Sequence, residues 1–172
     1  MASGNEMFRA SAMSGIPPAS SYPDLGVLAG GATPAEQIPR WGFDDSSVEY
    51  LDFVLELPAS YSGGGLTISF KTGGAATSGA YVLSAAIRRI QDDAEDIDST
   101  AHSYDFNDSS AITTPSAVGE VGYDNITFTS GADMDSLAAG EMFVLRIRRN
   151  TGSGSDTMTG DMYFYSLVGK ET

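Results

Sequence analysis

Apolar and polar residues alternate one by one over several short stretches of the chain beyond residue 40. Every second residue is apolar between Leu66 and Lys71, and Met142 to Arg149 repeats this pattern. Because successive side chains of a β-strand point to opposite faces, such alternation predicts half-buried antiparallel strands. The other expected strands span 51–57, 79–90, 125–129 and 162–168.

Glycine- and serine-rich runs separate these expected strands. The clearest turn sequences occupy residues 62–65, 72–74 and 151–156, and their residue types favour tight turns. One helical turn is expected over 132–139, with Asp133 as its N-cap. Strands do not alternate with long helices, so the pattern predicts an all-β fold, an antiparallel β-sandwich or jelly roll of roughly six to eight strands.

Residues 1–40 have a different character. They hold five of the seven prolines, and proline removes a backbone donor, so we expect neither a helix nor a central strand. The sequence therefore predicts an extended N-terminal arm over 1–40 and a sandwich domain over 41–172. The arm is either a disordered tail or a segment that binds a partner through spaced apolar residues. Those candidate partner-binding residues are Phe8, Met13, Ile16, Tyr22, Leu25, Leu28 and Ile38.

The charge balance excludes some partners. Nine basic residues against 23 acidic ones give a net charge of −14, which disfavours nucleic acid and anionic membrane surfaces. No apolar run reaches the roughly 20 residues that span a bilayer. The first ten residues lack a basic region followed by an apolar stretch, so we expect no signal peptide. The protein is expected to act inside the cell that makes it or to be released by lysis.

Few residues offer catalytic or metal-binding chemistry. The chain has no cysteine and a single histidine, His102, so disulfides, thiolate sites and an ordinary zinc site are not expected. No G-x-S-x-G motif accompanies the histidine. The acidic run 92–98 has carboxylates that suit calcium but lacks the spacing of a calcium-binding loop, which favours a solvated loop. We therefore expect no enzyme activity, no cofactor and no bound metal.

The order of several short motifs resembles a known group of proteins. Trp41-Gly42-Phe43-Asp44-Asp45 leads to the first strand, Leu137-Ala138-Ala139-Gly140 precedes the arginine-rich strand, and an aromatic strand follows Asp161. Over roughly residues 41–168 this order resembles jelly-roll virion structural proteins of tailed bacteriophages, in particular capsid decoration or cement proteins. The resemblance implies a homotrimer without a cofactor, placed on the outer capsid surface of a virion and bound to the major capsid protein. Such a protein would be made in the host cytoplasm.

The sequence is therefore compatible with two alternative functions. The first is a non-enzymatic structural protein that binds and stabilises a phage capsid. The alternative is a receptor- or carbohydrate-binding module of a phage fibre or tail, in which exposed aromatic rings stack on sugars. The tyrosines near predicted loops, which are the candidates for such stacking, are Tyr61, Tyr81, Tyr104 and Tyr123.

Overall fold

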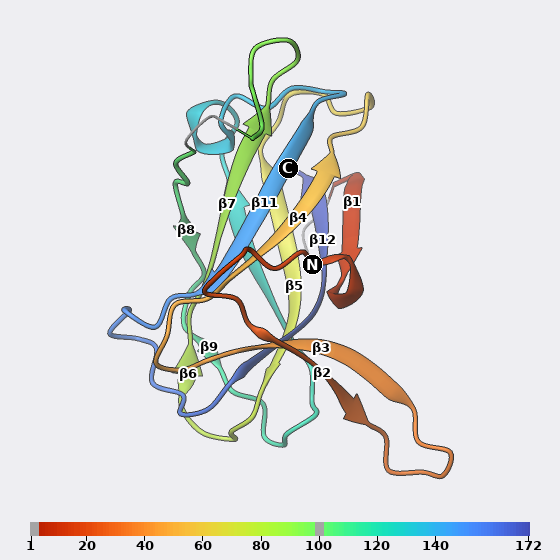
Figure 1. The fold of residues 1–172 in the computed structure, drawn as a ribbon, viewed down its shortest axis with the longest axis vertical. Helices are drawn as coiled ribbons and strands as arrows, with labels where there is room; N and C mark the ends of the chain where they lie inside the picture. Colours follow the sequence, from red (N-terminus) through yellow and green to blue (C-terminus); the bar gives the residue numbers. More distant parts are fainter. Residues whose placement is uncertain (1–3, 99–101) are drawn as a thin grey trace.

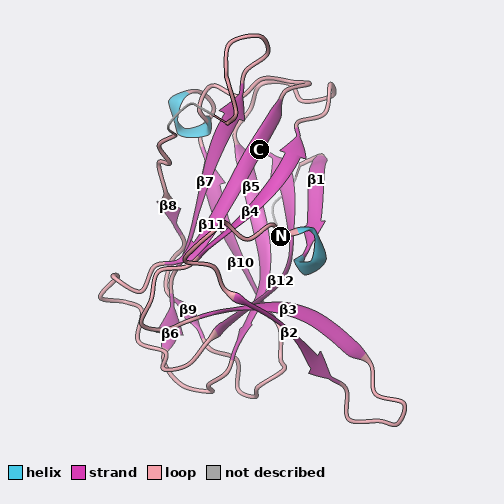
Figure 2. Ribbon diagram, viewed as in Figure 1, coloured by secondary structure: helices cyan, strands magenta, loops and turns pink. Residues whose placement is uncertain are grey.

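The computed structural model, which describes residues 4–98 and 102–172, is a sandwich of two antiparallel β-sheets. Figure 1 shows the smaller sheet in front of the larger one, and Figure 2 shows that strands and loops make up nearly all of the chain. The expectation of an all-β antiparallel sandwich is confirmed. No helix in the described ranges is long and apolar enough to cross a membrane.

The larger sheet has six strands and is built around the last one. In spatial order it runs β10, β5, β12, β3, β2, and β1 pairs with β12 beside β3. The bounds of these strands are β1 (Glu6–Ser11), β2 (Asp24–Ala29), β3 (Gln37–Phe43), β5 (Leu66–Gly74), β10 (Gly122–Phe128) and β12 (Met162–Glu171).

The smaller sheet has four strands in the order β4, β11, β7, β8, and a separate two-stranded sheet pairs β6 with β9. The bounds are β4 (Tyr50–Glu56), β6 (Ala80–Tyr81), β7 (Leu83–Ile90), β8 (Asn107–Asp108), β9 (Ile112–Thr113) and β11 (Met142–Arg149). The expected strand over 79–90 is thus divided at Val82 into β6 and β7, and each half pairs with a different strand. The expected helical turn shrinks to a 3-10 turn, η2 (Ala132–Met134), with Gly131 at its N-cap position.

Alternate residues of both sheets meet in one core. The rings of Phe53 on β4 and Phe164 on β12 lie 5.4 Å apart, which links the two layers. Leu51, Leu145 and Ile147 are fully buried with them. The alternation of apolar and polar residues in the sequence therefore describes the inward and outward faces of both sheets.

A β-bulge at Tyr165 changes which side of β12 faces the core. Before the bulge Met162 and Phe164 are buried, and after it Leu167 is the buried residue, so the inward set moves from even to odd positions. An extra residue in one strand of a pair produces this change of phase. As a result Val168 and Lys170 face outward, although a regular strand would have turned them into the core.

The structure corrects the expectation for the N-terminal arm at residues 6–11. Strand β1 pairs with β12 from Glu6↔Lys170 to Ser11↔Ser166, and Phe8 is only 8% exposed. The Phe8 ring packs 5.3 Å from that of Phe143. It covers the backbone of Gly169, where a Cβ atom would lie 2.2 Å from the ring. Phe8 is a core residue, and this part of the arm belongs to the sandwich.

The rest of residues 12–40 follows the sandwich and then leaves it. The 3-10 turn η1 (Ala12–Ser14) lies under Trp41, whose indole Nε1 donates to the carbonyl oxygen of Ala12 at 2.7 Å. The chain then runs along β4, where Ile16 and Asp52 exchange two backbone hydrogen bonds. Strands β2 and β3 form a hairpin that projects from the body of the molecule, at the lower right of Figure 1. Pro39 is accommodated in β3 because it lies in this projecting part, where β3 pairs with β2 but no longer with β12.

One buried arginine fixes the loop before β12. Arg149 at the end of β11 is fully buried, and its guanidinium donates to both carboxylate oxygens of Asp156, at 3.0 and 2.7 Å. It also donates to the carbonyl oxygens of Met158 and Gly160. A buried cation is tolerated only when it is paired and hydrogen-bonded, and four acceptors meet this condition.

We predict that Phe8→Ala destabilises the whole sandwich by about 3–5 kcal/mol, because it leaves a cavity between the sheets. The measurement is the free energy of unfolding in urea. Met13→Ala is the matched control, because Met13 is 63% exposed and its truncation should change the free energy by less than about 0.5 kcal/mol. Equal urea midpoints for Phe8→Ala and the unmodified protein would show that β1 adds nothing to the core.

Candidate functional site

The outer face of the six-stranded sheet carries a groove that crosses four strands. One end is a hollow of ≈ 240 Å³ beside β10, and it continues into a hollow of ≈ 540 Å³ beside β1. Lys71 and Val168 line both hollows. The first is also lined by Glu6, Ser69, Tyr123, Asn125 and Lys170, and the second by Arg9, Ala10, Ser11, Ser14, Ser166 and Leu167.

Strand register places these side chains in rows across the sheet. Ser69 on β5 lies between Asn125 on β10 and Val168 on β12. Lys71 lies in the next row, between Tyr123 and Ser166. The bulge at Tyr165 completes the groove, because it turns the second half of β12 to present Val168 and Lys170 outward. We call this feature the outer groove.

One wall of the outer groove is an exposed aromatic ring. Tyr123 is 70% exposed, and the ammonium of Lys71 lies 5.5 Å from its ring centroid. Next to it, the Ser69 hydroxyl donates to the side-chain oxygen of Asn125 at 2.5 Å, which leaves the amide nitrogen of Asn125 as a donor to a ligand. The groove thus combines a flat apolar surface with hydrogen-bonding groups.

The outer groove also contains charge of both signs. Arg9 binds Glu6 through two hydrogen bonds of 2.7 and 2.8 Å, and this bond lowers the pKa of the Glu6 carboxyl. Burial lowers the pKa of Lys71, and the nearby cations Lys170 and Arg9 lower it further. Three cations and one carboxylate therefore interact across the same face.

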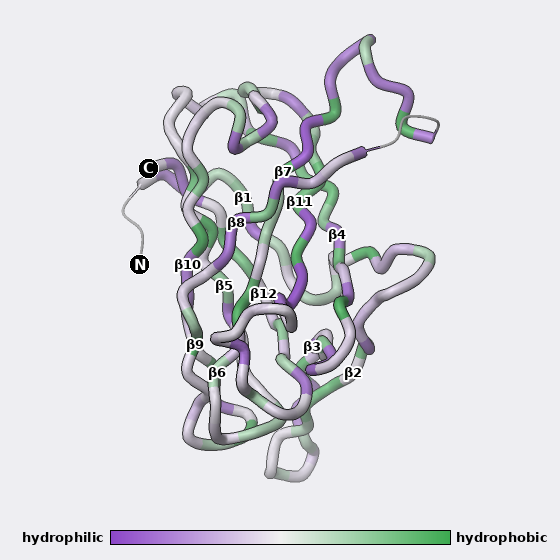
Figure 3. The backbone as a smooth tube through the Cα atoms, turned by 90° about the vertical axis from the view of Figure 1, so that its left-hand side faces the viewer, coloured by the Kyte–Doolittle hydropathy of each residue, from purple (hydrophilic) through white to green (hydrophobic). Residues whose placement is uncertain are grey.

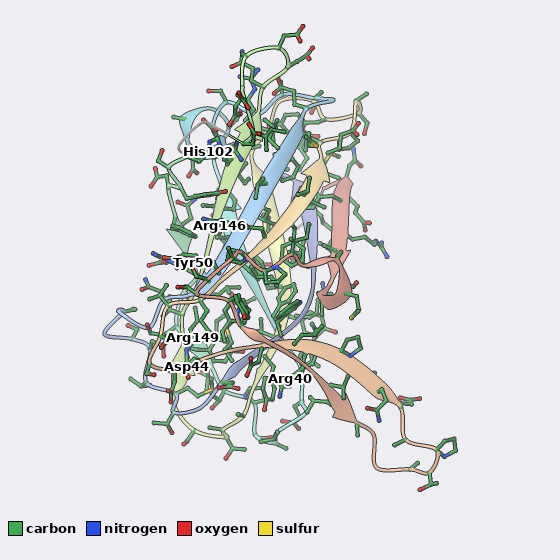
Figure 4. All side chains as sticks on the ribbon, viewed as in Figure 1. Arg40, Asp44, Tyr50, His102, Arg146 and Arg149 are labelled. Carbon is green, nitrogen blue, oxygen red and sulfur yellow. The ribbon has the colours of Figure 1, made fainter. Side chains whose placement is uncertain are left out.

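The outer face of the four-stranded sheet is occupied by the protein itself. Arg146 forms a bidentate ion pair with Asp52, both hydrogen bonds being 2.7 Å, and its guanidinium lies 4.1 Å from the ring centroid of Tyr104. Arg148 stacks in the same way on Phe106 at 4.0 Å. Figure 4 shows Arg146 and Tyr50 close together on this face. The stacked guanidinium groups of Arg146 and Arg148 thus hold Tyr104 and Phe106, just before β8, against this face.

The tyrosines proposed from the sequence therefore separate into two groups. Tyr61 and Tyr81 are buried. Tyr61 donates to the carbonyl oxygen of Gly64, and the Tyr81 hydroxyl lies 2.9 Å from that of Thr72. Tyr104 is stacked on Arg146. Tyr123 alone of the four projects into a groove.

The apolar residues proposed for partner binding are not brought together. Phe8 is in the core and Met13 is exposed on η1, whereas Ile16 and Tyr22 are exposed along the segment beside β4. The remaining three lie on the β2–β3 hairpin, where Leu25 and Ile38 are exposed and Leu28 is half-buried. Leu28 and Ile38 line a hollow of ≈ 260 Å³ together with Val118, Val121 and Tyr165.

The single histidine and the acidic run have structural contacts. Glu95 binds the guanidinium of Arg88, and His102 Nδ1 lies 3.1 Å from the same carboxylate. Residues 92–98 of the acidic run form a hydrophilic loop that projects at one end of the sandwich, purple in Figure 3. Within the described residues, no three acidic, histidine or cysteine side chains are placed to hold a metal ion.

Carboxylates crowd together at the base of the hairpin. Burial raises the pKa of Glu49 above its ordinary value of 4.5, and Asp44, Asp24 and Asp161 raise it further through charge repulsion, against the opposing effect of a hydrogen bond from the Asp44 amide. Burial also raises the pKa of Asp161. That hydrogen bond, from the Asp44 amide to Glu49 Oε2, measures 2.8 Å.

Comparison with known proteins identifies the fold but no family. No protein-family model and no curated protein matches the sequence. The structure is similar to the CBM22-1 xylan-binding domain of Xyn10C from Paenibacillus barcinonensis, with a TM-score of 0.51 and 10% identity over 98% of this chain and 95% of that chain. The CBM22-2 xylan-binding domain of the same protein gives 0.52 and 9% identity over 96% and 99%.

The sequence patterns did not identify most residues of the outer groove as candidate site residues. Lys71, Ser69 and Asn125 read as ordinary outward positions of a strand, and the bulge that exposes Lys170 has no sequence signature. A signal was nevertheless present, because Lys71 and Lys170 are the only lysines of the chain. Only the three-dimensional register shows that they share one face.

We predict that Glu49→Gln reduces the loss of stability as the pH rises. A carboxyl whose folded-state pKa is raised contributes stability below its unfolded pKa, and this contribution is lost as the pH rises through the folded value. Glutamine keeps an oxygen that accepts from the Asp44 amide but cannot ionise. The measurement is the free energy of unfolding in urea at several values between about pH 4 and about pH 7.

The control for this experiment is Glu56→Gln, at an exposed position of β4. Its profile should follow that of the unmodified protein. The interpretation fails if the Glu49→Gln profile is also parallel to it.

Proposed function

We propose that this chain is a non-catalytic carbohydrate-binding module that holds a polysaccharide in the outer groove. The observation that carries the proposal is Tyr123, a largely exposed ring that forms one wall of a groove lined otherwise mainly by polar side chains. A tyrosine ring offers a large, flat apolar face with a polar tip, which suits stacking on a sugar ring. The fold supports the proposal, since the two structures compared above are described as xylan-binding domains.

The groove has the groups that a sugar chain requires. The face of Tyr123 stacks on the apolar face of a sugar ring, and the Asn125 amide donates to a ring hydroxyl. Each such hydrogen bond adds about 0.5–1.5 kcal/mol after desolvation. The groove crosses β10, β5, β12 and β1. An extended groove of this kind suits a linear polymer, because successive sugar units can each contact it. The groove lies on rigid strands, so little ordering cost is paid on binding.

A structural role in a phage particle is the second candidate. The observation in its favour is the β2–β3 hairpin, which projects from the sandwich and carries the exposed residues Leu25, Val27 and Ile38. Exposed apolar residues gathered on one element favour a protein contact. In this reading the hairpin contacts the major capsid protein. The homotrimer, the virion location and the resemblance to decoration proteins stay predictions.

We predict that Tyr123→Ala lowers the affinity for a bound polysaccharide by about tenfold or more, because the stacking surface is removed. The full-length protein is tested by affinity gel electrophoresis against xylan, a mixed-linkage glucan, polygalacturonate and a sulfated galactan, and then by titration calorimetry on whichever bind. Tyr22→Ala is the matched control, because Tyr22 is also an exposed tyrosine and lies beside β4 in the other sheet. Binding that survives Tyr123→Ala would move the site away from the groove.

For the second candidate we predict that the double change Leu25→Ser and Ile38→Ser abolishes co-sedimentation with undecorated phage capsids. Both side chains are about half exposed, so the melting temperature should stay within a few degrees of the original. Salt should have little effect on the original contact, because screening acts on charges and not on apolar burial. Normal co-sedimentation of the double variant would exclude the hairpin as the attachment element.

A further inference from the structure

The positive charges of this acidic protein are unevenly distributed. The chain has nine basic residues against 23 acidic ones, and its only two lysines, Lys71 and Lys170, both line the outer groove. Arg9 lines the adjoining hollow. One third of the basic residues thus lies on one face, where Glu6 is the carboxylate that interacts with them.

The other arginines have structural partners. Four form ion pairs with a carboxylate, namely Arg88 with Glu95, Arg89 with Glu141, Arg146 with Asp52 and Arg149 with Asp156. The two that remain, Arg40 and Arg148, stack on the rings of Tyr163 and Phe106 at 3.8 and 4.0 Å. The residues that line the groove include three cations and one carboxylate, so its lining carries more positive than negative charge.

The arrangement has a cost that a ligand can remove. Lys71 lies where the two hollows meet. Its pKa is lowered chiefly by burial and then by the repulsion of Lys170 and Arg9, so the protein itself holds this ammonium in an unfavourable environment. An anion bound between the cations would offset both effects, and hydrogen bonds to charged groups contribute more than those between neutral ones.

We propose that the outer groove selects polysaccharides that carry anionic groups, either uronate carboxylates or sulfate esters. This inference rests on the proposed function and specifies its ligand. Tyr123 and Asn125 contact the sugar ring, as they would for any polysaccharide, while Lys71 and Lys170 bind its charged substituent. Both substituents present anionic oxygen acceptors to an ammonium, so the groove is expected to recognise this property that they share.

The net charge of −14 does not prevent such binding. At physiological ionic strength the Debye length is about 8 Å, so charges farther away are largely screened. The ammonium groups of the groove are at contact distance from a bound substituent, and their attraction is screened much less. The overall charge should slow the encounter with an acidic polymer, whereas the groove determines its affinity.

The first experiment compares each acidic polysaccharide with its neutral counterpart. The pairs are polygalacturonate with its methyl-esterified form, and a sulfated galactan with the same polymer after desulfation. We expect the unmodified protein to bind the acidic member of at least one pair about tenfold more tightly, and this preference to fall as sodium chloride rises from about 50 mM to about 500 mM. The pair that shows the preference identifies the substituent as carboxylate or sulfate.

The second experiment uses Lys71→Met together with Lys170→Met, which keeps the apolar stems and removes both charges. We expect this double variant to lose the preference, so that the acidic and the neutral member of each pair bind with equal affinity. The control is the double variant Val54→Glu with Ala59→Glu. Val54 is an exposed residue of β4 in the other sheet, and Ala59 is exposed just after that strand. This variant lowers the net charge by the same two units and should keep the preference. Circular dichroism on all variants tests that they are folded.

The two proposals fail differently. Equal binding to acidic and neutral members of both pairs overturns the charge selection and leaves carbohydrate binding intact. A preference that persists in the double lysine variant also overturns it, because the charge would then be recognised elsewhere. Absence of binding to every polysaccharide overturns the proposed function and this inference with it.

Discussion

Strand β12 is the element on which the rest of the sandwich depends. It pairs with β5 along one edge, and its other edge is shared, β3 pairing with its first half and β1 with its second. Strand β12 thereby holds chain segments that are distant in the sequence in one sheet. The bulge at Tyr165 lies where the shared edge changes partner from β3 to β1. The same irregularity also changes which side chains of β12 point into the core and which point outward. Core and groove are consequently two sides of one backbone feature.

The two outer faces of the sandwich serve different purposes. On the four-stranded sheet, Arg146 is paired with Asp52, and both Arg146 and Arg148 stack on aromatic rings of a covering loop, so that face is closed. On the six-stranded sheet the strands stay open to solvent over Lys71 and Tyr123. Closing one face with the chain's own side chains gives a rigid support, and rigidity on that side lets the open side present its groups in a fixed register.

Sequence patterns were informative wherever burial alone determines structure. The alternation over Leu66–Lys71 and 142–149 correctly predicted outward and inward positions, because a half-buried strand requires it. The pattern failed at 1–40, because β1 does not alternate regularly. An irregularity between Glu6 and Phe8 buries both Met7 and Phe8, so Glu6–Ser11 shows no period of two. It also failed for the groove. A bulge and the pairing of strands 50 to 100 positions apart decide which polar residues become neighbours, and no local rule contains that information.

The restriction of lysine to the outer groove has a practical consequence. Reagents that attach dyes, crosslinkers or solid supports to side-chain amines will react at Lys71 and Lys170, since the chain offers no other lysine. A protein labelled or immobilised in this way would have its groove obstructed by the label. The sequence contains no cysteine, so a single one introduced on the projecting β2–β3 hairpin would give a unique attachment point that leaves the groove free.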